Sequence, residues 1–277
     1  MATVQALLRC AENLATDSPK RDVEILLCHC LHKSRAWLYT WPETEVAAAQ
    51  AQHFEGLIAG RRQGMPIAYL TGQREFWSLQ LQVNNHTLIP RPETETLVEW
   101  ALQLPLPADA AVLDLGTGTG AIALAVASER PHWQVLAVDA SEEAIQVARS
   151  NAASAGLDHV SFLQSDWYQA VGGRRFHLLL SNPPYIDPKD PHLTQGDVRF
   201  EPRAALVALQ GGLADLASLI DGAPGRLLKG GWLLLEHGFE QGAAVRELLC
   251  CAGFSAVATR MDMAGHERIT GGCWHAE

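Results

Sequence analysis

The sequence lacks paired cysteines, long apolar runs and an excess of basic side chains, and each absence narrows what the protein can be. Six cysteines are present, namely Cys10, Cys28, Cys30, Cys250, Cys251 and Cys273. Their spacing shows no pairs, which argues against a disulfide framework and predicts a reduced, cytoplasmic protein. The longest apolar runs, such as 121–127, fall far short of a membrane span. The N-terminus has neither the basic region nor the apolar stretch of a signal peptide, so no membrane association is expected.

A metal site is not predicted either. The segment Cys28-His29-Cys30-Leu31-His32 has the residue types of a zinc site. It lies in a predicted helix, however, where positions 28 and 30 point to different faces. No second ligand pair occurs elsewhere in the chain, so a purely structural segment is the better interpretation.

Charge is divided unevenly along the chain. The formal net charge is −10, and residues 1–85 contribute none of it because their acidic and basic residues are equal in number. A protein that binds DNA or structured RNA normally presents a basic face to the phosphates. The acidic segment 86–277 therefore argues against nucleic acid, although a local basic patch would still be compatible with the total. A basic protein partner suits this charge better.

The chain of 277 residues exceeds the usual size of one domain, so a large domain and a small one are expected. Apolar residues at helical spacing, such as Val4, Leu7 and Leu14, predict a helical bundle over residues 1–75. The alternation from Phe76 to Val83 suggests a strand, and residues 76–90 are expected to form a β-hairpin linker. Residues 91–277 would then be the catalytic domain.

A glycine-rich turn follows the first strongly apolar segment of this larger domain. Residues 111–115 predict a buried strand, the turn is Gly116-Thr117-Gly118-Thr119-Gly120, and a helix is expected from Ala121 to Ser128. Glycines let the backbone pass close to a ligand and turn sharply into a helix. A second strand, Val135 to Val138, ends in Asp139, about 20 residues beyond the glycines. An acid at that spacing can bind both ribose hydroxyls of a nucleoside.

These two features alone leave alternatives open. Gly116-x-Gly118-x-x-Ala121 also satisfies a looser dinucleotide fingerprint, so a nicotinamide enzyme is a rival interpretation. A third strand, Val160 to Leu163, leads to Asp166-Trp167. Asp166 could accept a hydrogen bond from an adenine amine and Trp167 could flank the ring, but a solvent-facing strand end with a packing Trp is an equally good interpretation.

The segment Asn182-Pro183-Pro184-Tyr185 decides between these alternatives. It follows the apolar run Phe176 to Leu180, which predicts a buried strand. The side-chain carbonyl of Asn182 and the main-chain carbonyl of Pro183 can accept the two hydrogens of an –NH2 group. The prolines hold these acceptors rigidly, and Tyr185 offers a flat face to a planar amide or base. This arrangement indicates methyl transfer to a planar nitrogen. A hydride-transfer enzyme has no use for two fixed acceptors at that strand end.

In that order, Asp114-x-Gly116-x-Gly118-x-Gly120, Asp139, Asp166-Trp167 and Asn182-Pro183-Pro184-Tyr185 resemble an S-adenosylmethionine-dependent methyltransferase of the Rossmann-like class. Three further stretches narrow the resemblance: 71–77 (TGQREFW), 88–95 (LIPRPETE) and 196–202 (GDVRFEP). Together they are similar to the bacterial protein-(glutamine-N5) methyltransferases that modify peptide-chain release factors, the PrmC or HemK family. The resemblance covers essentially the whole chain.

The resemblance implies an α/β fold with a seven-stranded sheet and a small N-terminal helical domain that docks the protein substrate. It implies S-adenosyl-L-methionine as cofactor, with S-adenosyl-L-homocysteine as product. The cofactor would be held by Gly116 to Gly120, Asp139, Asp166, Trp167 and Asn182. The substrate amide would be held by Asn182, Pro183, Pro184 and Tyr185, with Asn182, Pro183 and Tyr185 as the catalytic set. The expected substrate is the glutamine of the Gly-Gly-Gln motif in class 1 release factors.

Several roles and functions stay open. Arg91 and Glu93 are candidates for the cofactor mouth, or else form a helix cap and a surface ion pair. Phe200 and Glu201, in a long irregular stretch, are candidates for contact with the substrate. Asn-Pro-Pro-Tyr could equally hold an adenine amine, so a nucleic-acid amine methyltransferase is a second hypothesis. A module that binds the cofactor without turnover is a third, against which the presence of Asn182 argues.

Overall fold

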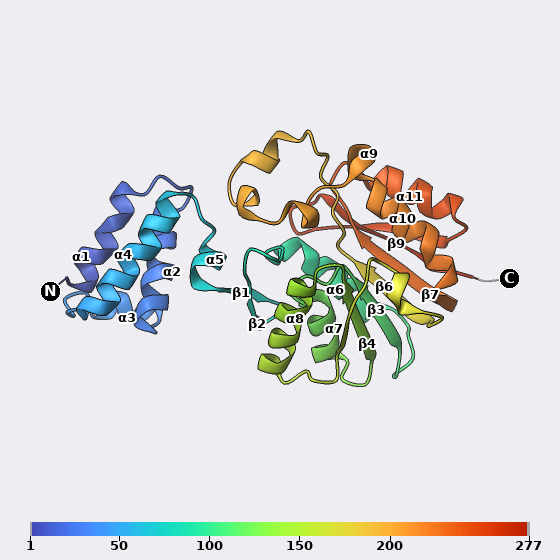
Figure 1. Cartoon of the computed structure of the whole chain (residues 1–277), viewed down its shortest axis with the longest axis horizontal. Coiled ribbons are helices and arrows are strands. Elements are labelled where there is room, and N and C mark those ends of the chain that lie inside the picture. The colour runs from blue at the N-terminus through green and yellow to red at the C-terminus, as the bar shows by residue number, and fades with distance from the viewer. Residues whose placement is uncertain (1, 276–277) are drawn as a thin grey trace. The chain divides into compact units, whose positions relative to one another are not determined.

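The computed structural model describes residues 2–275, and these fold into two compact units. The first unit holds the residues up to Gln73 together with Thr194–Phe200. The second holds Arg74–Leu193 and the residues from Glu201 onward (Figure 1).

The first unit is helical. Its elements are α1 (Val4–Leu8), 3₁₀ helix η1 (Arg9–Asn13), α2 (Pro19–Leu31), α3 (Arg35–Thr40), α4 (Ala48–Arg62) and α5 (Ile67–Thr71). Helix α2 begins at the proline that the Ser18-Pro19 pair places at the first helical position. The core of the unit is formed by Val23, Leu26, Leu27, Phe54 and Ile58, all buried.

A short segment from far along the sequence completes this unit. The Arg61 guanidinium donates to Asp22 Oδ2 at 2.7 Å and to Asp197 Oδ1 at 3.2 Å. Arg199 Nη2 donates to the main-chain carbonyl of Gln63 at 2.8 Å. The side chain of Arg61 is only 14% exposed, so these contacts are partly shielded from water. Residues 194–200 therefore belong to the helical unit although the expected domain boundary lies some 120 residues before them.

The expected strand from Phe76 to Val83 is wrong in its bounds. The structure has a hairpin of β1 (Gln73–Phe76) and β2 (Leu79–Gln82), with Trp77 and Ser78 in the turn at φ values of 50° and 62°. A two-residue turn with both φ values positive normally carries Asn or Gly, and this one carries neither. Its stability comes from tertiary hydrogen bonds instead: Trp77 N donates to Glu95 at 3.0 Å and the indole N–H donates to Glu129 at 2.9 Å.

The second unit is built on a seven-stranded sheet in the order β5-β4-β3-β6-β7-β9-β8. Its strands are β3 (Ala111–Leu115), β4 (Gln134–Asp139), β5 (Ser161–Gln164), β6 (Phe176–Ser181), β7 (Leu227–Glu236), β8 (Ser255–Met261) and β9 (Glu267–Trp274). Strands β3 to β7 pair in parallel, while β9 is antiparallel to both β7 and β8. The predicted α/β fold with a seven-stranded sheet is confirmed.

Helices cover both faces of this sheet (Figure 1). They are η2 (Pro92–Thr94), α6 (Glu95–Gln103), α7 (Ala121–Glu129), α8 (Glu142–Ala155), α9 (Leu209–Gly212), α10 (Ala214–Gly222), η7 (Ala223–Gly225) and α11 (Gly242–Cys251). Alternate strand residues point to opposite faces, so Leu178 and Leu180 pack in the core under α6 and α7. Leu179, between them, packs in the core under α10 and α11.

One buried amide joins three elements of this unit. The Asn151 side chain, on α8, accepts from Gln82 N at 2.7 Å and donates to the carbonyls of Gln82 and Thr119 at 3.1 and 2.9 Å. Asn151 is 1% exposed, so its partners depend on it rather than on water. It ties the hairpin and the glycine-rich turn to the same helix.

No helix within residues 2–275 combines the length and the apolar character needed to cross a membrane.

Replacing Asn151 by Leu should lower the free energy of unfolding by about 2 to 3 kcal/mol, because main-chain groups of Gln82 and Thr119 lose their partners. The neighbouring change Ser150→Ala, on the partly exposed side of α8, should cost less than about 0.5 kcal/mol. Urea unfolding followed by tryptophan fluorescence compares the two. Equal stability of N151L and S150A would contradict this account of the helix.

Candidate active site

The glycine-rich turn and the Asn-Pro-Pro-Tyr segment meet at one edge of the sheet. Strands β3 and β6 are parallel neighbours with Leu115 paired to Ser181, so Gly116 and Asn182 both emerge at their carboxyl ends. The Ser181 hydroxyl donates to the Leu115 carbonyl at 2.6 Å and fixes the two ends together. The strand order reverses between β3 and β6, and such a switch point is where open α/β sheets bind ligands.

The three glycines of the turn are required by its backbone. Gly116, Gly118 and Gly120 have φ values of 74°, 56° and 84°, which L side chains rarely adopt. A Cβ on Gly116 would also lie 3.2 Å from the Trp167 ring. The turn is held to β4, because Gly116 N and Thr117 N both donate to the Val138 carbonyl at 2.9 Å.

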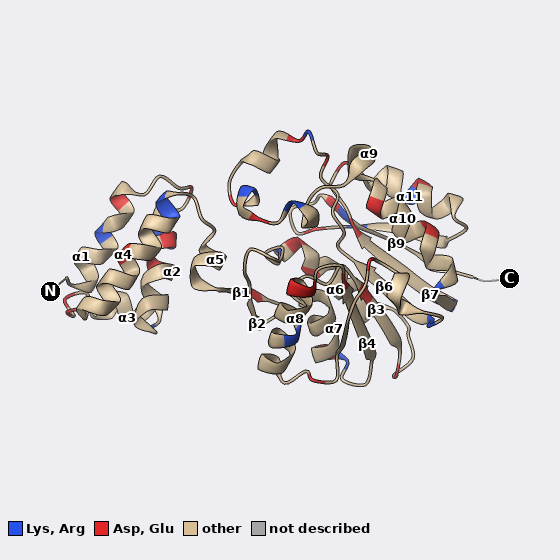
Figure 2. Cartoon of the chain, in the orientation of Figure 1, with Lys and Arg blue, Asp and Glu red and all other residues tan. Residues whose placement is uncertain are grey.

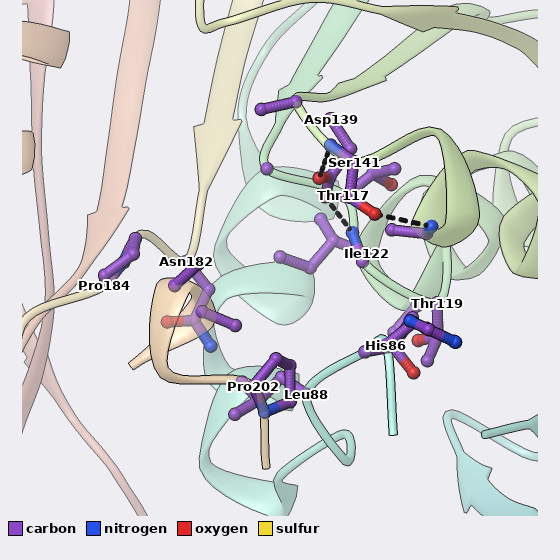
Figure 3. Close-up of a pocket in the computed structure, with 18 of the residues that line it drawn as sticks. His86, Leu88, Thr117, Thr119, Ile122, Asp139, Ser141, Asn182, Pro184 and Pro202 are labelled. Atoms are coloured by element: carbon purple, nitrogen blue, oxygen red, sulfur yellow. Dashed lines mark hydrogen bonds between the residues drawn. The ribbon is translucent and has the colours of Figure 1, made fainter. Parts of the chain in front are cut away.

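A cavity of about 540 Å³ opens at this edge. Its lining includes eight positions that the sequence analysis assigned to the cofactor, namely Gly116, Thr117, Gly118, Thr119, Asp139, Asp166, Trp167 and Asn182. Gly120 is not among the lining residues; it is the N-cap of α7, whose first residues, Ala121 and Ile122, do line the cavity. Asp139 and Ser141 border one part of the cavity, and Asn182 and Pro184 border another (Figure 3).

Asp139 is placed to hold a polar ligand and is itself held firmly. Its Oδ2 accepts from Gly118 N at 2.9 Å and its Oδ1 accepts from Ser141 N at 3.0 Å. Each carboxylate oxygen keeps a further lone pair for a hydroxyl. Burial raises the pKa of Asp139, while the N–H groups of Ser141 and Gly118 favour the charged form.

Trp167 forms a flat wall of the cavity. It has a left-handed backbone, with φ at 44°, in a turn where the Ser165 hydroxyl donates to the Trp167 carbonyl at 2.8 Å. Ser165 Oγ also accepts from Ala170 N at 2.9 Å. Asp166 lies exposed beside it and accepts from Gln169 at 2.8 Å. A bulky residue at positive φ is strained, and strain of this kind is often found at ligand sites.

The Asn-Pro-Pro-Tyr segment contributes unequally to the cavity. Asn182 and Pro184 line it, whereas Pro183 is buried and neither Pro183 nor Tyr185 is among its lining residues. The Tyr185 hydroxyl donates to Glu236 Oε1 at 3.2 Å. Burial, followed by the charge of Glu236, raises the pKa of Tyr185, so its hydroxyl keeps its proton. A Cβ on Gly212 would lie 2.0 Å from the Tyr185 carbonyl oxygen, so this glycine is needed for the backbone to pass.

Two residues that the sequence analysis did not single out hold Asn182 in place. Thr94 lines the cavity and accepts from Asn182 Nδ2 at 3.2 Å. Its own hydroxyl donates to Glu236 Oε2 at 2.6 Å. Burial raises the pKa of Glu236 to about 7. The one signal for Glu236 in the sequence is a charged residue directly after the apolar run Trp232 to Leu235. In the sheet this residue lies one position beyond Leu235, which pairs with Ser181.

Asp114 is a second buried carboxyl at this edge, besides Glu236. It is 0% exposed, and its Oδ2 accepts from the Thr117 hydroxyl at 2.5 Å. Its Oδ1 has no hydrogen-bond partner among the residues that the structure describes. Burial raises the pKa of Asp114 to about 7, against the opposing hydrogen bond from Thr117.

The remaining candidates fall in different places. Arg91 lines the cavity and pairs with Glu201, whose side chain is fully buried and also accepts from Ile89 N at 3.2 Å. Glu201 is therefore held inside the second unit, while Phe200, the preceding residue, belongs to the first. Glu93 is exposed and does not line the cavity. Within residues 2–275, no three His, Cys, Asp or Glu side chains converge as a metal-binding group.

The residues present fit a nucleoside cofactor with a charged tail. Above Gly118 a Cβ would meet nothing within 4 Å, so the turn leaves open space beside its backbone. Asp139 offers acceptors for ribose hydroxyls, and Trp167 offers a face for a planar base. The N-terminus of α7 adds the partial positive charge of its unpaired N–H groups.

Fold and site together define an S-adenosylmethionine-dependent methyltransferase. Two family models match the chain: the PrmC N-terminal domain over residues 4–72 and the methyltransferase small domain over residues 94–206. The chain is 52% identical to the release factor glutamine methyltransferase of Pseudomonas aeruginosa, over 99% of each chain. It is 49% identical to the protein of that name from Escherichia coli, over 94% of each. The chain belongs to the release factor glutamine methyltransferase family.

Solved structures show the same fold at low sequence identity. A methyltransferase from Pyrococcus furiosus aligns with a TM-score of 0.56 at 17% identity, covering 83% of this chain and 100% of the other. The catalytic domain of hMettl16, solved with an RNA hairpin, aligns with a TM-score of 0.57 at 15% identity, covering 83% of each chain. These likenesses support the architecture of the sheet and helices.

The buried carboxyl of Asp114 should make folding stability depend on pH. Its pKa is raised in the folded protein, so the stabilisation is fully present below the unfolded pKa of about 3.9 and is lost as pH rises through about 7. Asp114→Asn removes this titration and should flatten the decline in the free energy of unfolding between pH 5 and 8. Urea unfolding at both pH values measures the slope. An unchanged slope in D114N would show that Asp114 does not titrate in this range.

Proposed function

We propose that this enzyme transfers a methyl group from S-adenosyl-L-methionine to the side-chain amide nitrogen (N5) of the glutamine in the Gly-Gly-Gln motif of class 1 peptide-chain release factors. Methylation of that glutamine would support translation termination. Family membership supports the release factor as partner, since relatives at about half identity carry that name over nearly their whole length. A cytoplasmic location is part of the proposal, because the substrate is a translation factor.

One observation carries the chemistry: Asn182 lines the cavity, and its side-chain carbonyl oxygen is left to accept a hydrogen bond. Its Nδ2 is engaged by Thr94, and its Oδ1 accepts no hydrogen bond from any residue in the described part of the chain. The Pro183 carbonyl likewise accepts none within residues 2–275. These are the two acceptors that a substrate –NH2 group needs, one for each hydrogen.

S-adenosyl-L-methionine supplies a methyl group on a positively charged sulfur and leaves as S-adenosyl-L-homocysteine. An amide nitrogen is a weak nucleophile because its lone pair is delocalised, so the protein must contribute alignment. Holding the reacting groups in line can lower the barrier by about 7 kcal/mol or more in favourable cases. The rigid Pro183-Pro184 backbone and the anchored Asn182 provide such a hold.

Charge development explains why acceptors are the right groups here. Positive charge grows on the amide nitrogen as the new bond forms, so hydrogen bonds to Asn182 Oδ1 and the Pro183 carbonyl strengthen in the transition state. No residue has to remove a proton before attack, because the methylated nitrogen becomes strongly acidic and releases its extra proton to water after the transfer. Tyr185 keeps its proton because burial raises its pKa, so it does not serve as the base.

Docking of the protein substrate is assigned to the helical unit, with residues 91–277 as the catalytic domain and 76–90 as the linker. Tyr39 and Trp41 are 49% and 56% exposed, which is unusual for aromatic side chains and common at protein interfaces. The acidic charge of the catalytic unit would attract a basic partner.

A nucleic-acid substrate is the second candidate, since Asn-Pro-Pro-Tyr could hold an adenine amine. Figure 2 shows the Lys and Arg positions dispersed over several elements of the catalytic unit rather than gathered on one. That distribution does not favour a phosphate-binding face.

Methyl transfer from labelled cofactor into a recombinant class 1 release factor, followed by mass mapping, tests the function directly. We expect one methyl group on the glutamine of Gly-Gly-Gln. Label in RNA or DNA, with salt-sensitive binding and none in the release factor, would overturn the substrate and keep the methyltransferase.

Asn182→Ala should abolish turnover while S-adenosylmethionine affinity stays within about tenfold of wild type, because the change removes an acceptor for the substrate and spares the glycine-rich turn. Single-turnover methylation and calorimetric cofactor binding give the two values. Undiminished turnover would refute the role of Asn182.

A further inference from the structure

A chain of hydrogen bonds runs from the interior of the sheet to Asn182. Glu236 ends β7, is 1% exposed, and accepts on both oxygens: from Thr94 Oγ1 at 2.6 Å and from the Tyr185 hydroxyl at 3.2 Å. Thr94 Oγ1 in turn accepts from Asn182 Nδ2 at 3.2 Å. Strands β6 and β7 place Asn182 and Glu236 at equivalent positions beyond the Ser181–Leu235 pair.

The direction of these hydrogen bonds is dictated by Glu236. A carboxylate accepts hydrogen bonds and cannot donate, so the single hydroxyl proton of Thr94 is committed to it. The Thr94 oxygen can then only accept from Asn182. If the Asn182 carboxamide were turned over, Oδ1 would face the Thr94 oxygen with no proton between them. Only one of the two amide orientations is therefore compatible with an ionised Glu236.

We propose that Glu236 and Thr94 are positioning residues that set which way the Asn182 carboxamide faces, so that its carbonyl oxygen points to the substrate amide. This proposal rests on the proposed function of Asn182 as an acceptor for the substrate –NH2 group. Through its second oxygen, Glu236 holds Tyr185 in the same arrangement, so one carboxylate orients both ends of the Asn-Pro-Pro-Tyr segment.

The surroundings of Glu236 bring the ionisation of its carboxyl group close to neutral pH. Tyr185 after β6, Arg268 on β9 and Glu93 on η2 face it, and among these the arginine favours the charged form while Glu93 opposes it. Burial is the largest influence and raises the pKa of Glu236 to about 7. Once protonated, the carboxyl becomes a donor on one oxygen, and either Thr94 or Tyr185 loses its acceptor.

Glu236→Gln is the sharpest test, because it keeps the size of the side chain and leaves one acceptor oxygen where there were two. We expect kcat for methylation of the release factor to fall at least tenfold, with cofactor affinity and thermal stability close to wild type. Thr94→Val should give a similar loss, because the amide of Asn182 loses its partner. Thr94→Ser keeps the hydroxyl and should stay within about threefold of wild type.

Two measurements separate orientation from a merely structural effect. The double variant E236Q/T94V should be little slower than T94V alone, since both changes act through one chain of hydrogen bonds. The acidic limb of the wild-type kcat profile, centred near pH 7, should be absent in E236Q. Losses that multiply in the double variant, or an E236Q enzyme with wild-type kcat and pH profile, would overturn the proposal.

A readout without substrate makes the result independent of the proposed function. With ¹⁵N-labelled asparagine, the Nδ2 hydrogens of Asn182 (assigned by comparison with N182D) should exchange slowly in wild type and T94S and fast in T94V. If wild type transfers no methyl group to release factors, the function fails but this exchange pattern can still hold. Equal exchange in wild type and T94V would refute the orientation itself, even in a fully active enzyme.

Discussion

The parallel pairing of β3 with β6 is the constraint on which the rest of the site depends. Leu115 and Ser181 are partners in the sheet, and the Ser181 hydroxyl binds the Leu115 carbonyl. Because the strands run in the same direction, whatever follows each strand emerges on the same edge. A shift of one residue would turn the buried leucines of β6 to the wrong faces, so the cores on both sides of the sheet fix this register.

Carboxyl groups buried at this edge give the site its rigidity at a cost in solvation. Asp114, Glu201 and Glu236 are all hidden from water, and each is joined to a hydroxyl, a main-chain N–H or an arginine. Burying such groups is unfavourable unless they are paired. The arrangement therefore favours defined geometry over maximal stability, as expected where small displacements of an acceptor would slow a reaction.

The sequence predicted those parts of the structure that depend on neighbouring residues. Three alternating glycines predicted a turn that only glycine can make, and all three have positive φ. Apolar runs predicted strands at 111–115, 135–138, 160–163 and 176–180, where the structure has β3, β4, β5 and β6. The seven-stranded sheet, implied by the family resemblance, is confirmed. The hairpin turn at Trp77-Ser78 escaped prediction because it is stabilised by the distant Glu95 and Glu129, not by residues typical of such turns.

The residues of the site also fall into two groups, those predictable from local motifs and those that depend on partners distant in the sequence. The spacing of the motifs predicted that the glycine-rich turn, Asp139, Trp167 and Asn182 lie together, and the structure has them around one cavity, at the ends of parallel strands. Thr94 and Glu236 could not be found this way, because they are 142 positions apart and their partnership exists only once the sheet has formed. The position of Tyr185 outside the lining follows from the same hydrogen-bonded chain, which no local pattern encodes.

Residues 194–200 determine when the helical unit can complete its folding during synthesis. The helical unit has all of its α-helices once residue 73 has left the ribosome, but its last segment is translated some 120 residues later. Until then, Arg61 has Asp22 but not Asp197 as its partner, and the Gln63 carbonyl has no arginine to bind it. The nascent chain therefore carries an unfinished helical unit while strands β1 to β6 are being added. A fragment that stops at residue 73 would be permanently in the state that the whole protein passes through during synthesis.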